Sequence, residues 1–243
     1  MCRMIAFAST EPLDVGPYLG KLAEFARCGN LVDGWEKRPG GNHPNGWGIA
    51  CRQGDEIRVV RSGEPACADP NFAEIRARTD RFIGHVRYAS NTGTVNAANS
   101  HPFLAMGAAL AHNGTFYGTI GEEADRRKVS DTLVFLERLC ERWQERTFPA
   151  LKSAIEEIVG DPGLVGDYSA ANLLIASGES LFALRRYRRN ADYYTLYLKN
   201  SHGTVVAASQ PLEDAPGWRL LENGELVEMS PGATRSVILQ AAH

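Results

Sequence analysis

The order of strand-like and helical segments limits the possible folds of this chain more than any other sequence feature. Strand-like segments with one early helix come first, two helical segments follow, and strand-like segments return. Such blocks, unlike βαβ alternation, predict an α+β fold built in layers. The predicted strands are Cys2–Ser9, Trp47–Arg52, Glu56–Arg61, Phe82–Arg87, Ala108–His112, Asn172–Ala176, Ser180–Arg185, Thr195–Lys199, Thr204–Ser209 and Arg235–Gln240. The predicted helices are Thr10–Arg27, capped by Thr10 with Pro12 in its first turn, Asp131–Trp143 and Phe148–Val159.

Length and charge narrow the class of protein. The 243 residues contain no repeat or linker that would divide them, so residues 1–243 are expected to form one domain. With 26 Lys and Arg against 29 Asp and Glu, the net charge of −3 removes the usual electrostatic basis for binding nucleic acid. No apolar run approaches the roughly 20 residues that span a bilayer, and the N-terminus lacks a signal peptide's apolar region. We therefore expect a soluble, cytoplasmic protein without a membrane partner.

The cysteines give no sign of a metal site or a disulfide framework. They are odd in number and widely spaced, with no CxxC pair: Cys2, Cys28, Cys51, Cys67 and Cys140. The sequence also has no phosphate-binding loop and no cluster of metal ligands, so no nucleotide, metal or other cofactor is expected. Cys2 differs from the other four because it becomes the first residue if Met1 is removed.

Cys2 has two interpretations: a cysteine that begins a buried strand, or an N-terminal nucleophile. In the second case the thiol and a free α-amino group share one residue. The reference pKa of an α-amine, about 7.7–8.0, suits a general base near neutral pH. An unassisted thiol is only a few per cent ionised at pH 7, so a base within reach matters. No separate catalytic histidine would then be required.

Arg87 and His101 lie in two further segments that are rich in functional groups. Arg87 ends a strand within His85–Ser90, where it is either a strand-end side chain extending to solvent or a fork that binds a carboxylate through two hydrogen bonds. His101 lies in Asn99–Phe103, next to a proline, and taken alone it is a structural, hydrogen-bonded residue rather than a base.

The pair Asn113-Gly114 also allows two interpretations. Asn-Gly after a strand is a strong signal for a hairpin turn. Alternatively, the Asn113 amide and the Gly114 backbone N–H could both donate to an oxyanion, since glycine permits a close backbone approach.

Ser130-Asp131-Thr132 begins a predicted helix. The triplet is typical of a helix N-cap, and Asp131 could in addition bind a substrate ammonium group.

Taken in order, these residues resemble the class II glutamine amidotransferases, which are N-terminal-nucleophile hydrolases, and most closely the stand-alone members. The matching stretches are Met1–Arg3, Asn45–Ala50, His85–Ser90, Asn99–Phe103, His112–Gly114, Ser130–Thr132, Val205–Leu212 and Gly224–Val227. They cover nearly the whole chain, and their shared order is more specific than any single motif.

The resemblance implies a fold and a set of roles. The fold would be a four-layer αββα sandwich. Cys2 would attack the glutamine side-chain amide and form a γ-glutamyl thioester, with its own amine as the base, and ammonia would leave. Asn113 and Gly114 would form the oxyanion hole, while Arg87 would bind the substrate α-carboxylate and Asp131 its α-ammonium. Residues that would line or support the glutamate pocket are Tyr88, Ser90 and His101.

Two segments remain outside these motifs. The glycine-rich stretch Gly29–Gly46 is either a mobile lid near the site or a surface connection. The basic run Arg185–Arg189 is interpreted as a solvated strand end and turn, with an anionic partner as the alternative.

Three functions stay open at this point. The chain could be a glutaminase that supplies ammonia to a separate synthetase subunit, or a stand-alone hydrolase of a γ-glutamyl amide conjugate or peptide. It could also be a non-catalytic binding or regulatory subunit, which the intact set of Cys2, Arg87, Asn113 and Asp131 disfavours. Glutamine, or another γ-glutamyl amide, is thus the expected small-molecule partner.

Overall fold

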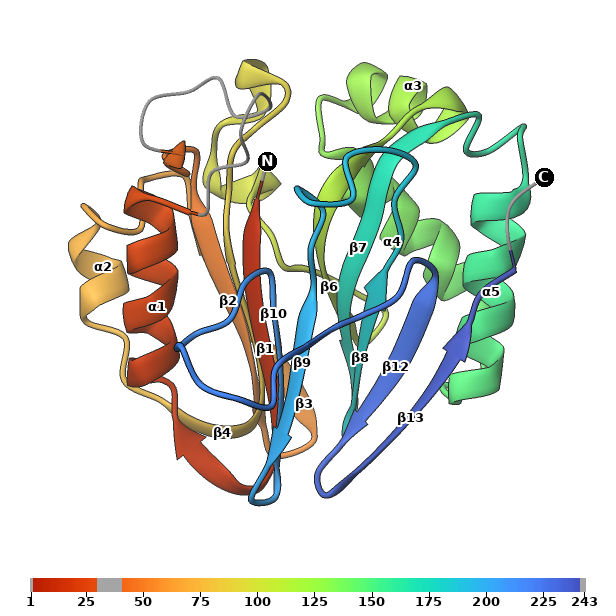
Figure 1. Ribbon diagram of the computed structural model, residues 1–243. Coiled ribbons are helices and arrows are strands. Elements are labelled where there is room, and N and C mark those ends of the chain that lie inside the picture. The colour runs from red at the N-terminus through yellow and green to blue at the C-terminus, as the bar shows by residue number, and fades with distance from the viewer. Residues whose placement is uncertain (1, 30–40, 241–243) are drawn as a thin grey trace.

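Two antiparallel sheets pack face to face, with helices on the outer face of each (Figure 1). The computed structural model describes residues 2–29 and 41–240. Hydrophobic cores lie between the sheets and between each sheet and its helices, so the layers run helix, sheet, sheet, helix. The predicted α+β class and its four-layer αββα arrangement are confirmed.

The first sheet has the strand order β11-β9-β10-β1-β4-β2-β3 and the second has the order β13-β12-β8-β7-β6-β5. The strands of the first sheet are β1 (Arg3–Asp14), β2 (Trp47–Gln53), β3 (Glu56–Ser62), β4 (Arg78–Val86), β9 (Tyr197–Ser201), β10 (Thr204–Ala208) and β11 (Arg219–Leu220). Those of the second are β5 (Phe103–Ala105), β6 (Ala108–Phe116), β7 (Tyr168–Ser177), β8 (Ser180–Arg185), β12 (Glu225–Ser230) and β13 (Ala233–Ile238).

The helices divide between the two outer layers (Figure 1). The α-helices are α1 (Gly16–Arg27), α2 (Pro70–Ala73), α3 (Gly118–Arg127), α4 (Asp131–Arg142) and α5 (Phe148–Gly160), and short 3-10 turns lie at Thr92–Thr94 and Ala97–Asn99. Side chains of α1 and α2 share a core with the first sheet, whereas α3, α4 and α5 share one with the second. Local sequence explains the starts of two helices, because the side chains of Ser130 and Thr147 cap α4 and α5.

The start of the first helix was predicted wrongly. Residues 10–14 continue β1 instead of forming a helical turn, and the helix begins at Gly16 with Pro17 in its first turn. The reason is long-range pairing: after a bulge, Leu13 pairs with Thr79 and Asp14 with Arg78 of β4. Strand pairing thus overrides the Thr-x-Pro signal on which the earlier start depended.

The other predicted elements are present, with shifts at their ends. Strand β4 begins earlier than predicted, at Arg78, and β6 continues past His112 to Phe116. The sequence analysis did not predict α3, which is short and strongly charged, or the strand β12. It also did not predict the short elements α2, β5 and β11.

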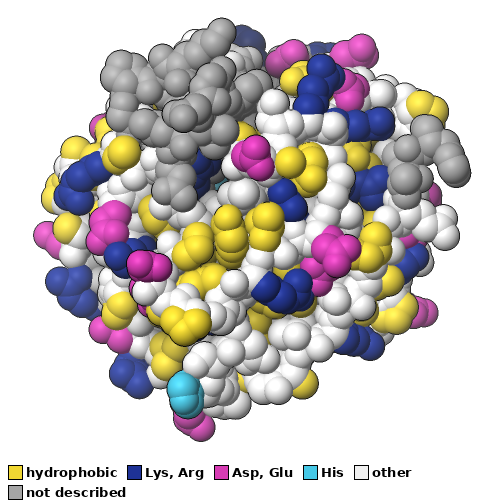
Figure 2. Space-filling model, in the orientation of Figure 1, with side chains coloured by type: hydrophobic (Ala, Val, Ile, Leu, Met, Phe, Trp, Pro, Cys, Tyr) yellow, Lys and Arg dark blue, Asp and Glu magenta, His cyan; other side chains and the backbone are white. Residues whose placement is uncertain are grey.

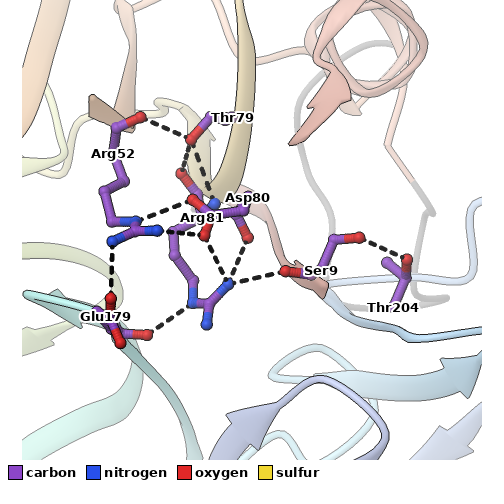
Figure 3. Close-up of polar contacts among 7 residues, drawn as sticks. All are labelled: Ser9, Arg52, Thr79, Asp80, Arg81, Glu179 and Thr204. Carbon is purple, nitrogen blue, oxygen red and sulfur yellow. Dashed lines mark hydrogen bonds and ion pairs between the residues drawn. The ribbon is translucent and has the colours of Figure 1, made fainter. Parts of the chain in front are cut away.

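A network of charged and polar groups joins the sheets at the end opposite the N-terminus (Figure 3). Arg52 makes a bidentate contact with Asp80 at 2.9 and 2.6 Å and reaches Glu179, in the β7–β8 turn, at 3.2 Å. Arg81 donates to the Glu179 carbonyl at 2.7 Å and to the Ser9 carbonyl at 3.0 Å. At this end the two sheets are therefore joined by direct contacts.

Candidate active site

Cys2 lies buried at the start of β1, in contact with a residue far away in the sequence. Its backbone nitrogen donates to Oδ1 of Asn113 at 3.1 Å, and its Sγ lies 3.9 Å from the Tyr88 carbonyl oxygen. The Ser209 hydroxyl accepts from the Met4 nitrogen at 2.9 Å, and Ser209 N donates back to the Met4 carbonyl at 2.9 Å, which fixes the start of the strand. The fold thus brings a thiol and an amide together in a buried place.

Asn113 and Gly114 lie inside a strand, so the hairpin interpretation is wrong. Asn113 pairs with Asn172 of β7 and Gly114 with Ala171. Because Asn113 Oδ1 accepts from Cys2, its Nδ2 is the free donor, and this buried atom has no hydrogen-bond partner among the described residues. A Cβ at Gly114 would lie 1.9 Å from the Ala170 carbonyl oxygen, so only glycine fits there.

Arg87 is buried at the end of β4, which overturns the solvent-facing alternative. Its guanidinium donates to the Thr94 carbonyl at 2.6 Å and to the Thr94 hydroxyl at 2.7 Å. Burial lowers the pKa of Arg87, while the negative charges of the Cys2 thiolate and of Asp131 act in the opposite direction. Arg87 therefore forms a fixed cation within electrostatic reach of the Cys2 thiol.

The Asn45-Gly46 motif supports the segment that follows β4. The Gly46 carbonyl accepts a hydrogen bond from Arg87 N at 2.9 Å, and the Asn45 side chain accepts one from Ala89 N at 3.0 Å. Gly46 has φ +114, and a Cβ there would lie 2.3 Å from the Ser100 hydroxyl. The motif thus holds the backbone on both sides of Tyr88.

Asp131 occupies the first turn of α4, after the Ser130 cap, so the N-cap prediction is confirmed. Asp131 Oδ2 accepts from Phe116 N at 2.7 Å, and Oδ1 accepts from Thr132 N at 2.9 Å. The same carboxylate therefore joins α4 to the end of β6, and it lines the pocket described next.

A pocket of about 270 Å³ lies next to these groups. Arg87, Ser90, Thr94, Tyr117 and Asp131 are among the residues that line it. The volume is below the usual range for drug-sized ligands, roughly 300–1,000 Å³, and suits a ligand of amino-acid size. A buried guanidinium and a carboxylate in one small pocket can bind a zwitterion through its two charges.

Five of the predicted residues do not line this pocket: Cys2, Tyr88, His101, Asn113 and Gly114. Cys2 contacts the Tyr88 carbonyl, and Tyr88 directly follows the pocket residue Arg87 in the chain. His101 Nε2 lies 3.2 Å from the Ser130 hydroxyl and its Nδ1 lies 3.1 Å from the His112 carbonyl. His101 therefore supports the Ser130 cap, and through it the start of α4.

A cluster of buried histidines lies beneath the site. The rings of His85 and His101 have centroids 4.5 Å apart, and His112 Nδ1 lies 3.0 Å from the Thr132 hydroxyl. Burial and the positive charge of Arg87 lower the pKa of His85 to about 3, and burial also lowers the pKa of His101 and His112. The cluster is therefore neutral at pH 7.

The sequence analysis missed Thr94, which holds Arg87 in the pocket, and Asn172, which pairs with Asn113 across the sheet. Asn172 Oδ1 accepts from Arg186 N at 3.0 Å, while its fully buried Nδ2 has no partner among the described residues. Its signal in the sequence is a single amide within the apolar run of β7. Thr94 carries no such signal, because only the folded loop brings it to Arg87.

The remaining sequence predictions have mixed outcomes. Most of the proposed lid, Gly29–Gly46, lies outside the described residues. In the basic run, Arg185 and Arg186 are buried, contrary to the solvated strand end expected, because backbone carbonyls and the Tyr168 hydroxyl accept from their guanidinium groups.

Neither a metal site nor a spanning helix is evident in residues 2–29 and 41–240. No group of three His, Cys, Asp or Glu side chains there could hold a metal ion, and none of these helices is long and apolar enough to cross a bilayer. Acidic and basic side chains are interspersed over the face shown in Figure 2.

Comparison with known proteins identifies several relatives. The sequence profile of the family "Glutamine amidotransferases class-II" matches residues 25–201, which include Arg87, Asn113 and Asp131 but not Cys2. An uncharacterized protein of Methanocaldococcus jannaschii is 28% identical over 79% of this chain, which spans only 62% of that protein. The gamma-glutamyl-hercynylcysteine sulfoxide hydrolase of Mycolicibacterium smegmatis is 26% identical, with 94% of this chain and 96% of that protein aligned.

Solved structures share the fold. A glutamine aminotransferase class-II domain protein from Silicibacter pomeroyi superposes with a TM-score of 0.64 at 19% identity, covering 99% of this chain and 100% of that one. The glutamine phosphoribosylpyrophosphate amidotransferase of B. subtilis superposes with a TM-score of 0.64 at 18% identity, covering 98% of this chain and 49% of that one.

Proposed function

Because the chain belongs to the class II glutamine amidotransferases, a family of enzymes, we propose that it hydrolyses a γ-glutamyl amide through a covalent intermediate on Cys2. The observation that carries the proposal is the contact between Cys2 N and Asn113 Oδ1, at 3.1 Å. This contact occupies the Asn113 oxygen and leaves Nδ2, on the same side chain, as a buried donor without a partner among the described residues. An unpaired donor held there is suited to stabilise an oxyanion.

In the proposed reaction, Met1 is first removed and Cys2 carries a free α-amine. The amine takes the thiol proton as the sulfur attacks the γ-carbonyl carbon, and the carbonyl oxygen becomes an oxyanion facing Asn113 and Gly114. The C–N bond then breaks, the leaving nitrogen takes the proton, and a γ-glutamyl thioester remains. Water attacks the thioester, releases glutamate and restores the thiol.

Substrate recognition is assigned to the two charged side chains of the small pocket. Arg87 would bind the α-carboxylate and Asp131 the α-ammonium of the glutamyl group, with Ser90 at the pocket wall and Tyr88 beside Cys2. His101 would act indirectly, by holding Ser130 and the start of α4. None of these contacts involves the leaving group, so they would serve every γ-glutamyl amide equally.

Two substrates are candidates. Family membership favours glutamine, whose amide would release ammonia to a separate synthetase subunit. The Mycolicibacterium smegmatis hydrolase, which acts on a γ-glutamyl conjugate according to its name and aligns almost end to end with this chain, favours a larger γ-glutamyl compound.

The test combines a substrate screen with covalent labelling. Purified enzyme is assayed with glutamine and with a set of γ-glutamyl amides, and then incubated with a glutamine-analogue electrophile and analysed by peptide mass spectrometry. Labelling is expected at Cys2, with activity lost in Cys2→Ala. Burial raises the pKa of Cys51 to about 12 and also raises that of Cys140, so neither should react.

The exposed cysteines serve as the matched control. Cys28→Ser and Cys67→Ser should keep full activity and full labelling at Cys2. Inactivation of the enzyme by modification at another cysteine, or turnover by Cys2→Ala, would contradict the proposal.

A further inference from the structure

A second cavity, of about 570 Å³, adjoins the small pocket. Tyr117 lines both of them, and the second cavity is completed by Asp167, Ser169, Arg189, Asn190 and Tyr194. Most of these residues belong to the segments before β7 and between β8 and β9. The β8–β9 segment lies at the same end of the sheets as the N-terminus (Figure 1).

Contacts of Cys2 and of the residue after it lead to both cavities. Cys2 N donates to Asn113 on β6, the strand that ends just before Tyr117. The guanidinium of Arg3 lies 5.2 Å from the centroid of the Tyr193 ring, and Tyr193 packs against Tyr194 of the second cavity. The start of β1 is therefore next to the wall that carries Tyr194.

The wall that carries Tyr194 is held in place by a buried arginine. Arg185 donates to the Tyr194 carbonyl at 2.9 Å, to the Ala191 carbonyl at 2.8 Å and to the Leu221 carbonyl at 2.7 Å. The Tyr194 ring also packs edge-on against Tyr193, with centroids 5.4 Å apart. This side of the cavity is therefore formed before any ligand arrives.

The charges of the cavity favour an anion. Arg189 Nη2 lies 3.0 Å from Asp167 Oδ2, and Arg188 Nε lies 3.7 Å from Oδ1 of the same carboxylate. Two guanidinium groups thus share one carboxylate, which leaves an excess positive charge. Arg189 lines the cavity and its side chain is 71% exposed, so it can turn to a bound carboxylate.

We propose that the cavity between Tyr117 and Tyr194 is the leaving-group subsite, and that it takes an amine bearing both a carboxylate and an apolar or aromatic group. The substrate class is then the γ-glutamyl derivative of an amino acid, with its carboxylate near Arg189 and its side chain against the tyrosine rings. The inference rests on the proposed hydrolysis at Cys2. A cavity of this size exceeds what ammonia needs.

The test compares two substrates that differ only in the carboxylate: γ-glutamylphenylalanine and γ-glutamylphenethylamide. The wild-type enzyme should show the higher kcat/KM for the first. Arg189→Gln should reduce the ratio of the two kcat/KM values about tenfold, because one charge-assisted contact is lost. Arg58→Gln, which removes an exposed arginine on β3, is the matched control and should leave the ratio unchanged.

A binding measurement separates the two ways of failing. Calorimetric titration of Cys2→Ala measures the affinity for both compounds without turnover. The compound with the carboxylate should bind more tightly. This preference should disappear when Arg189 is replaced as well. Hydrolysis that depends on Cys2, but without a carboxylate preference, would overturn the subsite alone. A carboxylate preference in binding without any hydrolysis would support the subsite and overturn the proposed function. Absence of both would overturn both.

Discussion

The backbone nitrogen of Cys2 donates a 3.1 Å hydrogen bond to the side chain of Asn113, a residue 111 positions further along the chain. This contact joins the start of β1 in one sheet to β6 in the other. It also orients the Asn113 amide, because the oxygen faces Cys2 and the nitrogen is left as a buried free donor.

If Asn113 Nδ2 stabilises the oxyanion, Asn113→Ala should lower kcat by roughly 10²–10³, or about 2.7–4 kcal/mol, as for loss of one such donor elsewhere. Steady-state kinetics on a γ-glutamyl amide measure this, with a thermal melt to count folded protein. Asn200→Ala, at an exposed position of β9, is the control and should change neither quantity. A variant that loses stability but keeps its kcat per folded molecule would make Asn113 a structural residue.

The proposed base exists only if Met1 is removed, because an amide nitrogen at Cys2 has no useful basicity. We expect mass spectrometry of active enzyme to show a chain that begins at Cys2. A preparation that uniformly retains Met1 should be inactive and should gain activity on treatment with a methionine aminopeptidase. Full turnover by the Met1-bearing chain would rule out the α-amine as the base.

Arg87→Ala and Asp131→Asn should each lower kcat/KM. The loss of transition-state stabilisation should be about 2–5 kcal/mol, since each variant leaves a buried substrate charge unpaired. The loss should be similar for glutamine and for every γ-glutamyl amide, because the glutamyl half is common to all. Asn keeps one of the two acceptors that hold Phe116 N and Thr132 N, so α4 should remain folded. Losses that depend on the leaving group would contradict these roles. Arg58→Ala and Asp55→Asn change exposed residues and are the controls, which should keep the wild-type kcat/KM.

We expect the protein to lose stability in mild acid because His85 is buried in its neutral form. The pKa of His85 is lowered to about 3 in the fold, so below pH 6.5 the unfolded chain binds a proton that the native state excludes. The contribution of neutral His85 to the free energy of unfolding is therefore complete above pH 6.5. Each pH unit below that value lowers the free energy of unfolding by about 1.4 kcal/mol.

Urea unfolding between pH 6.5 and 5 measures this effect, in a window above the ordinary range of carboxyl titration. The slope of unfolding free energy against pH should be smaller in His85→Gln than in the wild type. His202→Gln, at an exposed turn, should keep the wild-type slope. Equal slopes in all three proteins would show that His85 is protonated in the native state.

The sequence by itself determined what local chemistry controls. The order of strand-like and helical segments, the Ser130 cap and the order of the motifs can all be read from neighbouring residues, and the segment order sufficed for the α+β class. The tertiary structure decided what long-range pairing controls. Residues 10–14 are a strand because β4 pairs with them, and Asn113-Gly114 is strand rather than turn because β7 continues the ladder past it. Likewise, Arg185 is buried because carbonyls from three separate residues converge on its guanidinium, an arrangement that no local pattern encodes.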